Sequence, residues 1–334
     1  MTAPTPSGPW YLGIDLGGTN VRSGVVSHSG EVLSRTTART SAYRGPEAGV
    51  ANIVRLARQA VADSGLEIDQ IAAVGLATPG TMDIPAGTLV RPHNLPGWDD
   101  LPIRQLVADA LGRPIVLQND ANAAAYGEYW IGAGRDAHSL VFWTLGTGIG
   151  CGIIVADMII AGEHSHGSEC GHIVIQMDGG RSWHTGQSGT LEAYASATAL
   201  IQRCGEALSA GRETILHDWI AAGEELTPVL IGRAASQADP LAEELIMNCA
   251  RALGVGTTSL MHTIDPALVL IGGAMTFGRN DSPLGRRFLA RVRAEVNARA
   301  FPVPAAKTVI DYATLGGDAG FIGAAGCARR EFAT

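Results

Sequence analysis

The sequence of 334 residues has no stripe or cluster of lysine and arginine, and its formal net charge is −8. Nucleic acid is therefore not an expected partner, because nucleic-acid-binding domains gather basic residues on one face. No apolar run is long enough to span a bilayer. The first nine residues are small, polar and proline-rich, without the positive start and apolar region of a signal peptide. We expect a cytoplasmic protein that binds neither nucleic acid nor a membrane.

Paired cysteines are also missing. The five cysteines are odd in number, scattered along the chain and never spaced as CxxC. This pattern argues against a disulfide framework and indicates reduced thiols. The cysteines are Cys151, Cys170, Cys204, Cys249 and Cys327.

The composition that is present is that of a globular protein, with 46% hydrophobic residues, 17% charged residues and 43 glycines. A chain of this length exceeds one ordinary core and predicts two lobes. Strand patterns precede helix patterns twice, so we expect an α/β fold. The expected division is a smaller N-terminal lobe of residues 1–130 and a larger C-terminal lobe of residues 131–334. The final helix, at about 317–329, is the one element that could pack back on the first lobe.

Local patterns place the individual elements. Apolar runs predict strands at residues 10–16, 21–27, 31–37, 71–77, 114–118, 139–145, 152–156, 267–272 and 307–311. Helical spacing and end signals predict helices at 46–64, 101–111, 121–131, 283–298 and 317–329, with residues 191–262 mostly helical. Residues 163–190 are expected to form a long loop rich in glycine and histidine.

Two glycine-rich turns follow predicted strands. The first is DLGGTN at residues 15–20 and the second is TLGTGIG at residues 144–150. Adjacent glycines let the backbone approach an anion and direct amides towards it, and Asp15 could hold Mg²⁺ through water. Neither turn is a Walker A loop or a GxGxxG fingerprint. Each alone could be a tight turn, but one at the head of each half favours two phosphate loops.

Polar residues near these turns offer sugar-binding chemistry. Asp120, after the strand at 114–118, could deprotonate a substrate hydroxyl, or it could be only the N-cap of the next helix. Carboxylates, amides and imidazoles recognise several hydroxyls by hydrogen bonding, although each alone could be a solvated residue or a cap. The other members of this set are Asn94, Glu169, His172 and Glu192.

Together these motifs resemble the ROK family of repressors, open reading frames and sugar kinases, within the actin-like ATPase superfamily. The resemblance runs from about Trp10 to Cys327 and rests on the order and spacing of the segments 15–20, 78–80, 94–98, 119–120, 145–150, 169–172, 191–196 and 272–274. It implies a two-lobed actin-like (ribonuclease H-like) α/β fold with a central cleft. It also implies a homodimer.

The resemblance implies a role for each matching residue. Asp120 would be the catalytic base. The sugar would contact Gly80, Asn94, Asn119, Asp120, Glu169, His172 and Glu192. The phosphates of ATP would contact Asp15, Gly17, Gly18, Thr19, Asn20, Gly146, Thr147 and Gly148, and the adenosine would contact Gly272 and Gly273. Mg²⁺ would enter with ATP.

One departure from the family concerns zinc. Many members bind a structural zinc through the histidine of ExGH and three cysteines of a CxCGxxGC stretch, and here Trp183, Thr185 and Thr190 replace those cysteines. Tryptophan and threonine supply no thiolate, so we expect no structural zinc. Packing around Trp183, with hydroxyl bonds from Thr185 and Thr190, would hold the loop instead. A rearranged zinc site would have to use Cys170 with His164, His166 or His184.

The resemblance favours an ATP-dependent glucokinase of carbohydrate metabolism and glycolysis that makes glucose 6-phosphate. N-acetylmannosamine, N-acetylglucosamine and fructose kinases share much of the pattern. Polyphosphate is a less favoured donor, because a polyanion needs a basic groove. The alternative of another class is a non-catalytic, sugar-sensing regulator. Family repressors carry a DNA-binding segment before the first strand, and only about nine residues precede Trp10 here.

Overall fold

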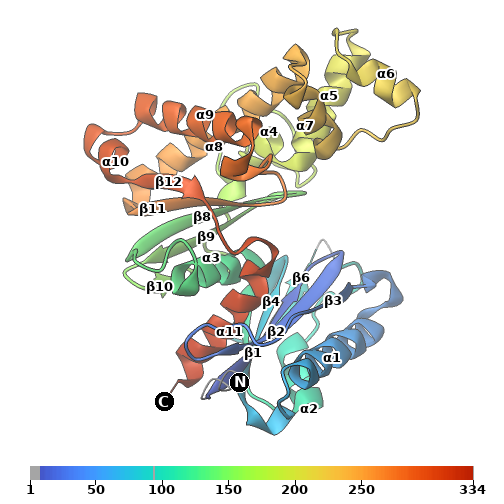
Figure 1. The fold of residues 1–334 in the computed structure, drawn as a ribbon, viewed down its shortest axis with the longest axis vertical. Coiled ribbons are helices and arrows are strands. Elements are labelled where there is room, and N and C mark those ends of the chain that lie inside the picture. Colours follow the sequence, from blue (N-terminus) through green and yellow to red (C-terminus); the bar gives the residue numbers. More distant parts are fainter. Residues whose placement is uncertain (1–7, 93–94, 334) are drawn as a thin grey trace, which may run out of the picture. The chain divides into compact units, whose positions relative to one another are not determined.

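The computed structural model describes residues 8–92 and 95–333. The chain forms two compact units, and both are discontinuous in sequence. Unit 1 consists of Met1–Ala137, Gly152–Ser168 and Thr314–Thr334, and unit 2 consists of His138–Cys151 and Glu169–Ala313. The expected cut after residue 130 lies close to the first boundary, which falls after Ala137. The final helix, which could return to the first lobe, is part of unit 1, and so is the segment Gly152–Ser168, which was not expected there. The predicted α/β class is confirmed (Figure 1).

Unit 1 is built on a five-stranded sheet with the order β3-β2-β1-β4-β7. Its strands are β1 (Trp10–Leu16), β2 (Asn20–Ser27), β3 (Thr36–Arg39), β4 (Ile71–Thr78) and β7 (Ile115–Asn119). β1, β2 and β3 pair antiparallel, whereas β1, β4 and β7 run parallel. The carboxyl ends of β1, β4 and β7 therefore lie at one edge of the sheet.

Helices cover both faces of this sheet. They are α1 (Pro46–Asp63), α2 (Ile103–Leu111), α3 (Asp120–Ile131) and α11 (Ala319–Phe332). Leu12 and Ile14 of β1 share a core with Ile53 of α1, whereas Tyr11 of the same strand packs with Phe321 of α11. Alternate residues of a strand point to opposite faces, so the two cores lie on opposite sides of the sheet.

The last helix lies unusually close to the first sheet. A Cβ on Gly13 of β1 would be 1.8 Å from the Phe321 oxygen, and a Cβ on Gly75 of β4 would be 1.8 Å from the Ala324 oxygen. Only glycine leaves room for the helix backbone at these two positions. The contact explains why α11 belongs to unit 1 although it ends the chain.

The second five-stranded sheet has the order β10-β9-β8-β11-β12. Its strands are β8 (Ser139–Leu145), β9 (Ile149–Val155), β10 (Met158–Ile159), β11 (Leu268–Gly273) and β12 (Val309–Tyr312). β8, β11 and β12 run parallel within unit 2, and the boundary between the units falls inside β9. The helices of unit 2 are α4 (Glu192–Ala195), α5 (Ala197–Ser209), α6 (Leu216–Ala221), α7 (Pro228–Ser236), α8 (Pro240–Ile264), α9 (Pro283–Arg299) and α10 (Pro302–Lys307).

The third expected strand, at residues 31–37, is wrong in its bounds. The β2–β3 ladder pairs Ser23 with Thr36 and goes no further, and Val32 makes only an isolated bridge. Ser34 interrupts the ladder between Val32 and Thr36. Its buried hydroxyl accepts a hydrogen bond from Val25 N and donates one to the Ala60 oxygen. A side chain thus takes the place of a backbone partner.

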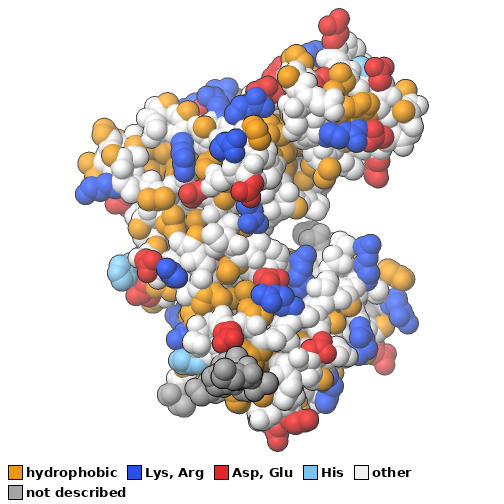
Figure 2. Space-filling model, viewed as in Figure 1, with side chains coloured by type: hydrophobic (Ala, Val, Ile, Leu, Met, Phe, Trp, Pro, Cys, Tyr) orange, Lys and Arg blue, Asp and Glu red, His pale blue; other side chains and the backbone are white. Residues whose placement is uncertain are grey.

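Several short elements were not expected from the sequence. They are the β5–β6 hairpin (Thr81–Asp83 and Thr88–Arg91), β10 and α10. Within the described residues, none of the helices is both long and apolar enough to cross a bilayer. Basic and acidic side chains are interspersed on the face shown in Figure 2.

Candidate functional site

In unit 1, the predicted residues gather at the carboxyl edge of the sheet. Asp15 on β1 pairs in register with Ala77 of β4, and Thr78 of β4 pairs with Asn119 of β7. Parallel strands end at the same edge, so this register brings Asp15 and Asn119 to it. Ligands of α/β proteins bind at this end of their parallel strands.

Asp15 is a half-buried carboxylate beside the first glycine turn. Burial raises its pKa to about 6, although the charge of Arg22 opposes the shift. The Arg22 guanidinium lies 3.9 Å from Asp15 Oδ2. A Cβ on Gly320, in the first turn of α11, would be 2.4 Å from the same oxygen. The carboxylate therefore faces a helix N-terminus, where negative charge is stabilised.

The turn after Asp15 is closed by a hydrogen bond from Gly17 N to the Asn20 oxygen, at 2.9 Å. Gly18 and Thr19 are exposed. An exposed turn of small residues next to a carboxylate fits the phosphates of a nucleotide with its hydrated magnesium. The residues present are thus compatible with MgATP.

Asp120 is not the N-cap of α3. Asn119 is the cap, since its Oδ1 accepts from Ala121 N (2.9 Å) and Asn122 N (3.1 Å). Asp120 is the first residue of the helix, is half-buried, and accepts from Ala121 N through Oδ1 at 2.8 Å. That bond orients its carboxylate at the edge of the sheet.

Gly80 lies in the turn after β4 with φ of 85°, and a Cβ there would be 2.6 Å from Pro92 Cα. The turn therefore packs directly on the segment that leads to Asn94. Asn94 itself lies outside the described residues. Further along this segment, Trp98 is fully buried, and its indole donates to the Ala42 oxygen at 3.4 Å.

In unit 2, the second glycine turn is braced by Glu192. The turn closes through Gly146 N and the Gly148 oxygen at 3.0 Å, and Ile149 N then donates to Glu192 Oε2 at 2.7 Å. A Cβ on Gly148 would be 2.3 Å from the same Oε2. The buried carboxylate of Glu192 thus holds the turn, and its predicted contact with sugar stays a prediction.

Trp183 holds the other oxygen of Glu192. The indole Nε1 donates to Glu192 Oε1 at 2.6 Å, and both side chains are buried. Trp183 stands at the first of the three cysteine positions, so the expected packing residue is also a hydrogen-bond donor. The sequence signalled an apolar residue in a polar loop but not this partner.

The expected threonine bonds are only partly present. Thr185 Oγ1 donates to Gln187 Oε1 at 3.4 Å. The Thr190 hydroxyl is buried and has no partner among the described residues, so the expected bond from Thr190 is wrong. The backbone of Thr190 instead bridges to Val174 and holds the loop there.

Glu169 precedes a 3₁₀ turn, Cys170–His172, that ends with His172 and packs on the same glycine turn. A Cβ on Gly171 would be 2.3 Å from the Ile149 oxygen. His172 is half-buried, and its Nδ1 is buried without a partner among the described residues. A buried ring nitrogen without a partner is costly, and a substrate hydroxyl can satisfy it.

Gly272 and Gly273 lie beside the second turn at the end of β11. They pair in register with Thr144 and Leu145 of β8, and Met275 N donates to the Leu145 oxygen at 3.0 Å. Next to them is a cavity of about 430 Å³. Its apolar lining was not predicted and includes Val229, Ala274, Met275, Phe277 and Leu284. An aromatic ring of a ligand fits such a lining.

The described residues, 8–92 and 95–333, contain no group of three histidine, cysteine or acidic side chains placed to hold a metal. The rearranged set around Cys170 is not assembled. Cys170 is buried beside Cys151, and a hydrogen bond from Cys151 lowers the pKa of the Cys170 thiol.

Comparison with known proteins identifies relatives over nearly the whole chain. The protein-family model described as "ROK family" matches residues 11–331 of this chain. A glucokinase of Halalkalibacterium halodurans is 30% identical over 94% of this chain and 93% of its own length. The structure of a ROK family glucokinase from Streptomyces griseus, in complex with glucose and AMPPNP, has a TM-score of 0.80 and 30% identity, covering 96% of this chain and 100% of that one. A xylose repressor of Caldicellulosiruptor bescii is 28% identical over 87% of this chain and 70% of its own length.

Proposed function

The chain belongs to the ROK family, and on that premise we propose that it is an ATP-dependent hexose kinase that makes glucose 6-phosphate. The observation that carries the proposal is that two adjacent residues at the start of α3 have different roles. Asn119 caps the helix, while the Asp120 carboxylate is held at the sheet edge that also carries Asp15. This arrangement supports Asp120 as the base and Asp15 as the carboxylate near the phosphates.

Asp120 acts as the general base in this proposal. It accepts the proton of the 6-hydroxyl of the sugar while that oxygen attacks the γ-phosphorus of ATP. The bond from the γ-phosphorus to the bridging oxygen breaks, and ADP leaves with the electron pair. Phosphoryl transfer depends mainly on positioning and charge neutralisation, so a single base suffices.

The nucleotide is assigned to the glycine turns. In unit 1, the amides of the exposed residues 18 and 19 bind phosphate oxygens, and Asp15 orients the hydrated magnesium that supplies positive charge. In unit 2, the turn at 146–148 binds phosphate, and the cavity beside Gly273 accepts the adenine. The AMPPNP complex of the Streptomyces griseus relative supports ATP as the donor.

The predicted sugar contacts are kept in the proposal. In unit 1 they are Gly80, Asn94 and Asn119, and in unit 2 they are Glu169, His172 and Glu192. Sites that hydrogen-bond several hydroxyls discriminate strongly against analogues that lack one. The glucokinase relatives favour glucose over fructose or N-acetyl sugars.

The decisive experiment is ADP release with MgATP against glucose, mannose, fructose, N-acetylglucosamine and N-acetylmannosamine. We expect turnover with glucose. Asp120→Asn should lower kcat at least about a hundredfold and leave glucose binding largely intact. Asp136→Asn, at an exposed aspartate of the same unit, is the matched control and should keep full activity.

Two results would count against the proposal. Near-normal turnover by Asp120→Asn would remove Asp120 as the base. Sugar binding without turnover on any sugar, by folded wild-type protein, would favour a sugar-sensing regulator instead.

A further inference from the structure

An arginine-lined cavity of about 500 Å³ lies in unit 2, and none of the residues assigned above lines it. Its basic lining comes from Arg181 of the long loop, Arg203 of α5, Arg251 of α8 and Arg299 at the end of α9. The amides of Gln176 and Asn248 also line it. In a protein with a formal charge of −8, four guanidinium groups around one cavity form a local positive field.

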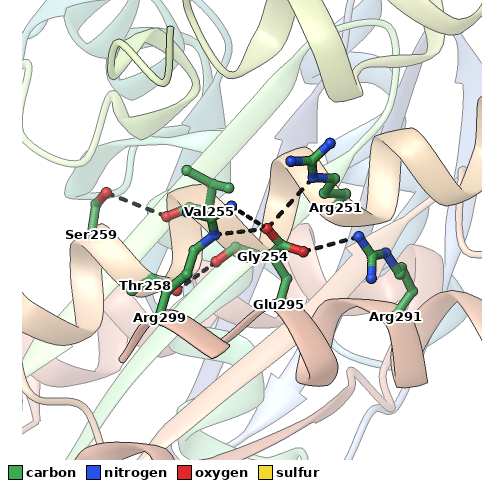
Figure 3. Close-up of polar contacts among 8 residues, drawn as sticks. All are labelled: Arg251, Gly254, Val255, Thr258, Ser259, Arg291, Glu295 and Arg299. Atoms are coloured by element: carbon green, nitrogen blue, oxygen red, sulfur yellow. Dashed lines mark hydrogen bonds and ion pairs between the residues drawn. The ribbon is translucent and has the colours of Figure 1, made fainter. Parts of the chain in front are cut away.

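Carboxylates neutralise only part of this charge. Glu295 is shared by three arginines, with Arg251 at 3.6 Å, Arg291 at 3.0 Å and Arg299 at 2.6 Å (Figure 3). Burial pushes the pKa of Glu295 up, but the hydrogen bond and charge of Arg299, with Arg291 and Arg251, hold it below its ordinary value. One buried negative charge thus serves three positive ones.

The other two lining arginines are also short of acceptors. Arg181 pairs with Glu206 through its terminal nitrogens, but its buried Nε has no acceptor among the described residues. Arg203 donates from Nη1 to the main-chain carbonyl oxygen of Tyr194 at 3.2 Å and to Cys249 Sγ at 3.9 Å. Neither acceptor is charged. An anion that enters the cavity would supply the missing acceptors.

We propose that this cavity is a regulatory site for a small phosphate ester. Guanidinium groups match phosphate oxygens in a bidentate fork, and the flanking amides can bind hydroxyl groups of the ester. The volume lies in the range of small-molecule sites.

Tyr194 connects the cavity to the braced turn. It lines the cavity and sits on α4 together with Glu192. Its hydroxyl accepts from Arg181 N at 2.8 Å and donates to Gln176 Oε1 at 3.0 Å. An anion that draws Arg203 away from the main-chain oxygen of Tyr194 loosens α4. It thereby also loosens the glycine turn that Glu192 holds. Occupancy therefore weakens sugar binding, a consequence that rests on the proposed function.

The first test measures binding alone, by calorimetry at low salt, with inorganic phosphate and glycerol 3-phosphate as probes. The variants are Arg203→Gln/Arg251→Gln and the milder Arg251→Gln, at a residue that is 55% exposed. Arg212→Gln removes the same charge from an exposed pair elsewhere in unit 2 and is the control. We expect the double variant to bind at least about tenfold more weakly, Arg251→Gln to be intermediate, and Arg212→Gln to match wild type.

Equal affinity in wild type and the double variant, or no binding at millimolar probe, would overturn the site whether or not the protein is a kinase.

The second test measures glucose affinity with and without saturating glycerol 3-phosphate. We expect a weakening of about threefold or more in wild type and none in the double variant. Unchanged glucose affinity in wild type would overturn the regulatory role. If Asp120→Asn kept its turnover, that result would count against the proposed function and not against the anion site.

Discussion

At the scale of single residues, the candidate site depends on which side-chain oxygen accepts each hydrogen bond. Asn119 takes the capping bonds of α3, so the adjacent Asp120 is not consumed as a cap. Glu192 places one oxygen on the glycine turn and the other on Trp183. The Asp120 carboxylate is oriented by the backbone N–H of Ala121, and the Glu192 carboxylate by Ile149 N and the indole of Trp183.

Trp183→Phe tests the bond that stands where the family has a zinc ligand. The change keeps the ring and removes the N–H, which leaves Glu192 Oε1 buried without that donor. We expect a loss of about 2 kcal/mol in stability, because bonds to charged groups are worth about that much. The turn at 146–149 should also loosen, lowering kcat/KM about tenfold.

Trp10→Phe is the control for this change, because the indole Nε1 of Trp10 in unit 1 has no hydrogen-bond partner among the described residues. It should leave kcat/KM unaltered. An unchanged kcat/KM in Trp183→Phe would mean that the turn does not depend on the indole bond.

Asp15 gives a pH-dependent prediction. Its folded-state pKa is about 6, against an ordinary value of 3.8. Between these values the folded protein keeps a proton that the unfolded chain has released, so stability falls as pH rises through this window. Above it, the buried charge costs about 3 kcal/mol.

Asp15→Asn removes that cost. Without nucleotide or magnesium, the variant should melt above wild type at about pH 7.5 and close to it at about pH 4. The measurement is the melting temperature of both proteins at the two pH values. A difference that is the same at both would show that Asp15 titrates normally.

At the scale of elements, the parallel strands with a turn or helix directly after them were well predicted. β1, β4, β7 and β8 fall within about a residue of their expected bounds, because a buried parallel strand leaves a continuous apolar run. The expected strand at 31–37 failed because the Ser34 hydroxyl replaces a backbone partner, and one residue's tertiary bond leaves no periodic signal. The β5–β6 hairpin is too short to show alternation.

Gly75→Ala tests the close approach of α11 to the first sheet. The added methyl would lie 1.8 Å from the Ala324 oxygen, which is backbone and cannot rotate away. We expect a loss of about 3 kcal/mol or more in the free energy of unfolding, measured by urea denaturation.

Gly205→Ala is the matched control within α5. Nothing lies within 4 Å of a Cβ at this position, so the change should stabilise the helix by up to about 1 kcal/mol. A tolerated Gly75→Ala would show that the helix can move outward from the sheet.

At the scale of the whole molecule, the sequence indicated two halves and a final helix that could return to the first, but it gave no sign that Gly152–Ser168 also belongs to unit 1. The glycine turns and Asp120 could be found because each follows a strand and carries a local signature. The Trp183–Glu192 bond and the arginine-lined cavity could not be found. They join residues from separate loops and helices, and only the tertiary fold brings these together.

Deletion of residues 319–334 tests this membership. The change removes α11, which unit 1 uses to cover one face of its sheet. We expect hydrogen exchange to show lost protection in β1 and β4, with protection kept in α8 and β11 of unit 2. Uniform loss in both units would mean that they fold as one cooperative body.

The place of α11 also has a consequence for synthesis. Domains usually fold in order as they leave the ribosome, with the N-terminal one first. Here β1 and β4 emerge early, but the helix that closes over Gly13 and Gly75 is translated only after all of unit 2. The first-made sheet must therefore wait until unit 2 has been synthesised. In that interval it exposes one apolar face, which is where a nascent-chain chaperone would bind.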